Sequence, residues 1–159
     1  MTDDRSRSTS APITGLSHVQ LLVADITASA EWYGAALGLE RYVENLDRGY
    51  IALRHPSSGV GVVLTNRPVA ATGASGSSPP TNGATVPGSG AILDHLAFAV
   101  PDGESLRSWA DHLTTIGIDH RGVAAETGGL SLHLFDLDGT DIELVAPGPG
   151  PGIPQPAPG

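Results

Sequence analysis

The chain contains no cysteine, and this absence removes several kinds of chemistry at once. Disulfide bonds, zinc sites with thiolate ligands and catalysis by a cysteine nucleophile all need that residue, so each is excluded. Basic residues are scarce as well, with 8 Lys and Arg against 17 Asp and Glu and a formal net charge of −9. Because phosphate groups must be met by cations, this balance argues against nucleic acid and against an anionic membrane surface as partners.

Long hydrophobic segments are also missing. No apolar run approaches the ~20 residues that are needed to span a bilayer. The segment 1–12 is polar and lacks the apolar stretch of a secretory signal, so we expect a cytoplasmic protein without a membrane partner.

What the chain does contain is an internal repeat, in which residues 15–64 correspond to residues 92–144. The matched pairs are Leu16/Leu93, His18/His95, Val23/Val100, Asp25/Asp102 and Trp32/Trp109. Near the end of each copy one matched position differs, with Val63 in the first copy and Glu143 in the second. The repeat therefore supplies two equivalent histidines and a single carboxylate.

Composition divides the chain around these two copies. We expect a disordered tail at 1–12, a first module at 13–68, a flexible Gly/Ser/Pro linker at 69–90, a second module at 91–147 and a Pro/Gly tail at 148–159. A total of 159 residues suits one domain, or two half-domains that share a core.

Each copy shows the pattern strand, helix, then three strands. Short apolar runs at 19–23 and 96–100 predict the first strands, and Asp25 and Asp102 are placed to cap the helices that follow. Gly38 and Gly117 are expected to end those helices. The later strands are expected at 40–46, 50–55, 60–65, 119–124, 131–135 and 140–145. The fold class is therefore α+β, built from two β-α-β-β-β modules.

The matched residues suggest a metal site. A single histidine in a strand is more often a core residue, but two at matched positions together with a carboxylate reverse that preference. His18, His95 and Glu143 would leave a divalent metal ion with open coordination positions. Fe(II), Mn(II), Ni(II), Co(II) and Zn(II) all accept such ligands, so the identity of the metal stays open.

Two further histidines are candidates for contact with a substrate. His133 alternates with Ser131 and Phe135, which places these three side chains on one face of a strand. If that face lines the site, His133 is a catalytic candidate, although an ordinary surface or core histidine fits the pattern equally well. His120, at the start of the preceding strand, is a weaker catalytic candidate.

The order of elements, the histidine of the first strand and the closing segment Asp136-Leu137-Asp138-Gly139 to Glu143-Leu144 resemble the vicinal oxygen chelate superfamily. That superfamily includes glyoxalase I, type I extradiol dioxygenases, fosfomycin resistance proteins, methylmalonyl-CoA epimerase and bleomycin resistance proteins. The resemblance implies paired modules that form an open barrel around a metal held by His18, His95 and Glu143. It also implies a homodimer, in which one site can combine ligands from two chains.

Departures from the family pattern leave the subfamily open. Glyoxalase I and the epimerases have an acidic ligand in the first module, where this chain has Val63. Extradiol dioxygenases have tyrosine and proline where His133 and Leu137 stand here.

Two function classes remain. One is a metal-dependent dioxygenase, lyase or isomerase acting on a small substrate with adjacent oxygens, and the other is a metal-free, bleomycin-resistance-type binding protein. The complete ligand triad and an aromatic content of only 4% favour the enzyme.

Overall fold

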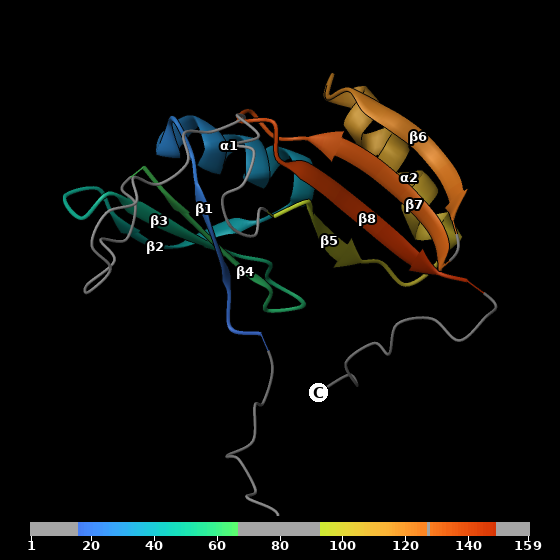
Figure 1. Cartoon of the computed structure of the whole chain (residues 1–159), viewed down its shortest axis with the longest axis horizontal. Coiled ribbons are helices and arrows are strands. Elements are labelled where there is room, and N and C mark those ends of the chain that lie inside the picture. The colour runs from blue at the N-terminus through green and yellow to red at the C-terminus, as the bar shows by residue number, and fades with distance from the viewer. Residues whose placement is uncertain (1–15, 67–92, 127, 149–159) are drawn as a thin grey trace, which may run out of the picture.

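The computed structural model describes residues 16–66, 93–126 and 128–148, which form two modules lying side by side (Figure 1). The segment 1–12, the linker at 69–90 and all of the tail at 148–159 except its first residue lie outside the described residues. Neither helix in the described ranges has the length and hydrophobicity needed to cross a membrane.

Both modules have the predicted order of elements. The first contains β1 (Val19–Leu22), α1 (Ile26–Leu37), β2 (Glu40–Asn45), β3 (Tyr50–Arg54) and β4 (Gly61–Thr65). The second contains β5 (His95–Ala99), α2 (Gly103–Thr115), β6 (His120–Glu126), β7 (Gly129–Phe135) and β8 (Asp141–Pro147). The four-stranded sheets have the orders β1-β4-β3-β2 and β5-β8-β7-β6, with the first strand of each parallel to its neighbour. This mixed α+β architecture confirms the predicted fold class, and the sheets are not closed into a barrel.

The helix ends follow the local chemistry of the sequence. The Asp25 carboxylate accepts hydrogen bonds from the backbone N–H groups of Thr27 and Ala28, at 3.0 Å each. The Asp102 carboxylate accepts from Ser105 N at 2.8 Å. At the other end of α1, Gly38 takes a left-handed conformation with φ 66°, which a side chain would disfavour. The predicted starts of both helices are therefore confirmed.

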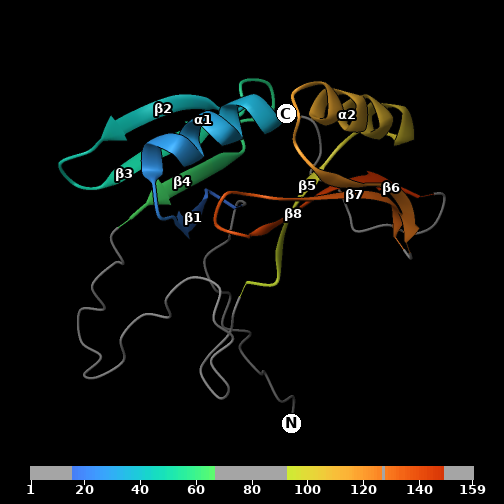
Figure 2. The same ribbon diagram turned by 90° about the horizontal axis from the view of Figure 1, so that it is seen from above.

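Each helix covers one face of the sheet of its own module, and the core of the module lies between that helix and that sheet (Figure 2). Alternation along β8 sends Ile142 and Leu144 into the core of the second module, where they are 0% and 2% exposed. Trp32 and Trp109, at matched positions of the repeat, are half-buried and pack against the border of the core. No described helix packs on the opposite face of either sheet, and we call this the open face of the sheet.

Hydrogen bonds of the β7–β8 turn join the two modules. The buried Tyr33 hydroxyl donates to Asp136 Oδ2 at 2.8 Å, and Ala24 N donates to Asp138 Oδ1 at 2.9 Å. Burial and the neighbouring Asp136 carboxylate raise the pKa of the Tyr33 hydroxyl, so this group remains a donor. The turn between β7 and β8 thus fixes the start of α1 against the second module.

Candidate metal centre

Glu143 lies on the open face of the second sheet. Its neighbours Ile142 and Leu144 point into the core, so alternation turns the Glu143 side chain the other way. In the register of the sheet, Glu143 is opposite Ala97 on one side and His133 on the other. The carboxylate is nevertheless only 9% exposed, which is unusual for a charged group on an uncovered sheet face.

The structure brings His95 and Glu143 together. His95 Nε2 lies 3.4 Å from Glu143 Oε2, while Nδ1 of the same ring is 2.9 Å from Asp94 Oδ2. Because a carboxylate only accepts hydrogen bonds, Nδ1 carries the hydrogen and Nε2 faces Glu143. The hydrogen bond to Asp94 is the main reason that the pKa of His95 is raised; burial opposes it, and the charges of Glu143, Asp94 and Asp141 raise the pKa further.

This pair has the spacing of two ligands of one metal ion. Imidazole nitrogen and carboxylate oxygen bind divalent metals at about 2.0–2.2 Å, so two such atoms at ordinary coordination angles lie roughly 3.0–3.5 Å apart. The observed separation of 3.4 Å falls in that range. A carboxylate on the far nitrogen, as Asp94 provides here, is also the usual way in which a metal-binding histidine is oriented.

His18 occupies the equivalent position in the first module but does not join this pair within the chain. It lies beside Gly61 of β4, as His95 lies opposite Asp141 of β8, which supports the matched positions inferred from the repeat. Its side chain is exposed, and its Nδ1 is 3.2 Å from Ser17 Oγ. Within the described ranges, His18, His95 and Glu143 do not form a group of mutually close ligand atoms.

Glu126 and His133, instead of His18, lie close to Glu143. Glu126, His133 and Glu143 each place a ligand atom within 4.8 Å of the others. His133 Nε2 is 3.5 Å from Glu126 Oε1 and 3.7 Å from Glu143 Oε1, while His133 Nδ1 is 2.9 Å from Asp141 Oδ1. The two rings of His95 and His133 therefore cover Glu143 from two sides, which explains its low exposure.

His120 is placed elsewhere. Its Nδ1 accepts a hydrogen bond from Gly122 N at 3.0 Å, and its Nε2 is 2.9 Å from Thr114 Oγ1 on α2. In the register of the sheet it lies opposite Leu134, which is fully buried on the helix side. Both ring nitrogens thus have structural partners, and His133 is the one of the two predicted catalytic histidines that lies beside Glu143.

Sequence reasoning did not identify Glu126 as a participant. It lies at the end of β6, opposite Gly129 of β7, and its side chain extends along the strand as far as His133. Finding it required the register of the β6–β7 hairpin, for which the sequence offers only weak signals. Asp94 and Asp141 could have been found, because each lies next to a predicted ligand or on the same strand face.

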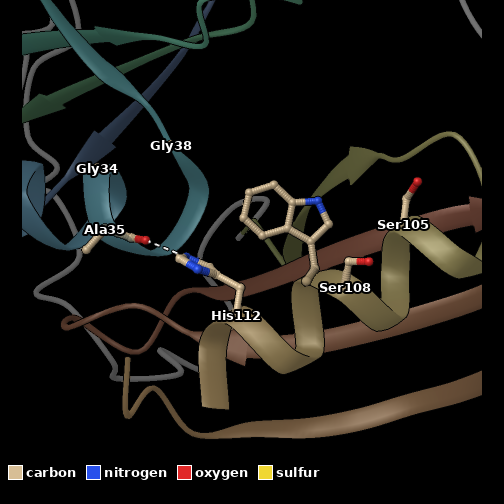
Figure 3. A pocket seen from close by; sticks show the side chains of 7 residues that line it. Gly34, Ala35, Gly38, Ser105, Ser108 and His112 are labelled. Atoms are coloured by element: carbon tan, nitrogen blue, oxygen red, sulfur yellow. Dashed lines mark hydrogen bonds between the residues drawn. The ribbon is translucent and has the colours of Figure 1, made fainter. Parts of the chain in front are cut away.

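A hollow on the helix side of the molecule is separate from this cluster. This cleft of about 510 Å³ lies between the end of α1 and the side of α2, and Trp109 is among its lining residues. Figure 3 shows His112 of α2 extending toward Ala35 of α1. His112 Nε2 is 2.8 Å from the carbonyl oxygen of Ala35, so its ring ties the two helices together. His95, His133, Glu126 and Glu143 lie on the other side of the second sheet, on its open face.

A family model described as the Glyoxalase/Bleomycin resistance protein/Dioxygenase superfamily matches residues 15–144, a span that contains both modules and the histidine–carboxylate cluster. The chain belongs to this superfamily. The resemblance drawn from the repeat and its motifs is thereby confirmed. No curated protein sequence shows significant similarity to the chain.

Solved structures of the superfamily share the fold. A glyoxylase/bleomycin resistance protein/dioxygenase domain from Frankia sp. EAN1pec is 24% identical with a TM-score of 0.65, over 86% of this chain and 99% of that one. Lactoylglutathione lyase from Agrobacterium tumefaciens is 18% identical with a TM-score of 0.61, over 86% and 96% of the two chains.

A third relative was solved with ligands. A variant of the fosfomycin resistance protein FosX from Listeria monocytogenes, complexed with Mn(II) and 1S,2S-dihydroxypropylphosphonic acid, is 17% identical with a TM-score of 0.61. The match covers 86% of this chain and 94% of that one. At these identities the likeness establishes the superfamily fold.

Proposed function

We propose that the chain is a divalent-metal-dependent enzyme that acts on a small substrate bound through two adjacent oxygen atoms. The observation that carries this proposal is the His95–Glu143 pair, with its 3.4 Å separation and with Asp94 on the far nitrogen of the imidazole. His95, Glu143 and a copy of His18 would hold the ion, leaving positions open for the substrate. When bound, such a metal supplies Lewis-acid stabilisation of a developing oxyanion, or a site for O₂ if it is Fe(II).

The protein groups around the pair have separable tasks. Asp94 fixes the His95 ring so that Nε2 is presented to the ion, and Glu143 supplies the anionic ligand. His133, beside Glu143, is the candidate for contact with the substrate. Val63 stands where Glu143 stands in the second module, so the first module offers no carboxylate at that position to act as a base. This favours lyase, isomerase or dioxygenase chemistry that needs only three protein ligands.

A second copy of the chain would complete the site. His18 is exposed at the edge of the first module, away from the His95–Glu143 pair, and the open faces of both sheets carry no described cover. A homodimer in which the first module of one chain faces the second module of its partner would bring these groups together. The site would then contain His95 and Glu143 of one chain and His18 of the other.

We place the protein in the cytoplasm.

Metal analysis of protein purified without chelator tests the proposal. We expect a stoichiometric divalent metal in the wild type, and at least ~10-fold weaker retention in Glu143→Gln, because an anionic ligand becomes neutral. Glu40→Gln, an exposed strand glutamate of the first module, is the matched control and should keep the metal. A His18→Ala, His95→Ala, Glu143→Ala triple variant with wild-type metal content would overturn the ligand assignment.

Binding of a simple chelating probe separates the enzyme from a metal-free binding protein. Catechol and oxalate both present two adjacent oxygens, and calorimetry should show that they bind the metal-loaded protein but not the metal-free one. Equal binding to the two forms would instead support a metal-free small-molecule binder.

A further inference from the structure

The open face of the second module gathers more negative charge than one metal ion needs. Glu126 and Glu143 approach the same imidazole nitrogen, His133 Nε2, at 3.5 and 3.7 Å. Asp141 adds a third carboxylate at the other nitrogen, at 2.9 Å. These three acidic side chains come from β6 and β8, on both sides of β7, and converge on one ring.

The orientation of His133 is set in the same way as that of His95. Asp141 accepts the hydrogen of Nδ1, so Nε2 is left facing two carboxylate oxygens. Three acceptors around one small space repel one another unless a positive group lies between them. Their separations, all within 4.8 Å, are those of ligand atoms that surround a cation.

A buried hydroxyl without a partner lies beside these groups. Ser131 Oγ has no hydrogen-bond partner and the residue is only 1% exposed, which makes it the unsatisfied buried side chain of the described ranges. Ser131 and His133 share one face of β7. Glu126 lies opposite Gly129 and yet reaches His133, so its side chain passes over the position of Ser131. The unsatisfied hydroxyl therefore belongs to a residue on the same face of the sheet as the ligand atoms, next to His133 along β7.

We propose that Glu126, His133 and Glu143 bind a second divalent cation, next to the one assigned to His18, His95 and Glu143. Glu143 is shared: Oε2 faces His95 and Oε1 faces His133, which is the arrangement of a carboxylate that bridges two ions. Bridged ions of this kind lie about 3.5–4 Å apart in two-metal sites. Ser131, on the same face of β7, would offer its unsatisfied hydroxyl to the second ion or to a water molecule on it.

Counting bound Mn(II) tests this inference, which rests on the proposed function only through the shared Glu143. Metal-free protein is titrated with Mn(II), and free ion is measured from its EPR signal. We expect two equivalents per chain in the wild type and in Glu40→Gln, one in Glu126→Gln, and one in His95→Ala. The double variant His95→Ala, Glu126→Gln should bind none. Because Glu126 is half-exposed, its conversion to Gln leaves the fold intact, which circular dichroism verifies.

The outcomes separate the two assignments. The second site is overturned if the wild type and Glu126→Gln each bind one equivalent of Mn(II) and His95→Ala binds none. That result leaves the first site in place. Loss of Mn(II) in Glu126→Gln but not in His95→Ala supports the site proposed here and overturns the proposed one at His95. In the doubly loaded wild type, bridging by Glu143 should also broaden the Mn(II) EPR spectrum through spin coupling. An uncoupled spectrum at two equivalents would contradict the shared carboxylate.

Discussion

Replacing Tyr33 by phenylalanine removes a single oxygen from the contact between the modules. That oxygen donates to Asp136 Oδ2 at 2.8 Å, with Tyr33 0% and Asp136 7% exposed. Asp136 Oδ1 keeps its own donors, Asp138 N at 3.0 Å and Thr140 N at 2.7 Å, so the variant leaves one carboxylate oxygen without this partner. Hydrogen bonds to charged groups contribute about 1.5–3 kcal/mol, so Tyr33→Phe should lower the free energy of unfolding by roughly 2 kcal/mol.

Urea denaturation followed by circular dichroism measures this change. Tyr42→Phe is the control, because Tyr42 is 66% exposed and loses only a hydroxyl on the surface, with an expected change within about 0.5 kcal/mol. Since the hydrogen bond joins the two modules, Tyr33→Phe should also broaden the transition if the modules begin to unfold separately. A Tyr33→Phe variant as stable as Tyr42→Phe would refute the view that this contact holds the modules together.

Two further predictions concern single residues. In metal-free protein the His95 ring should titrate above its usual pKa of ~6.5 by NMR, and Asp94→Asn should lower that value. The stabilisation from the protonated ring is present below pH ~6.5 and is lost as the pH rises through the raised pKa. Metal affinity should change in the opposite sense, because acidification protonates the His95 imidazole and so weakens metal binding. Metal binding that is unchanged from pH 8 to 5 would point to a site without histidine. Gly129→Ala should destabilise the fold by about 2 kcal/mol or more, because φ is 148° and a Cβ would clash with the Ala146 carbonyl oxygen. Gly128→Ala, with open space around it, should be nearly neutral in thermal unfolding, and equal effects of the two substitutions would contradict the described hairpin.

Local patterns in the sequence predict the modules well. Asp25 and Asp102 lie before apolar helical stripes, and their side chains cap the two helices as expected. The repeat is equally informative, because a duplicated unit must place matched residues at matched points of its sheet. For this reason the amino-acid sequence alone is enough to equate the positions of His18 and His95.

Features that depend on long-range geometry could not be predicted. The Tyr33–Asp136 hydrogen bond spans 103 residues and two modules, and no local pattern signals it. The sequence makes His120 a weaker catalytic candidate, but the register shifts between His120 and Val123, and the ring lies toward α2. Such an irregularity changes which face a side chain occupies, and alternation alone cannot reveal it.

Subunit exchange between two variant dimers is the most direct test of the central claim, which is that two chains share one metal site. His18→Ala keeps His95 and Glu143, while His95→Ala keeps His18, and both substitutions leave Glu126 and His133 untouched. After mixing, random exchange of subunits makes about half of the dimers mixed. Each mixed dimer has one intact site and one that lacks both histidines, so about a quarter of all sites are restored. Metal analysis should therefore recover roughly a quarter of the metal that the separate variants lack. Recovery of that fraction is the result we predict. No recovery in a mixture shown to contain mixed dimers, or a monomeric protein in sedimentation at micromolar concentration, would contradict the shared site.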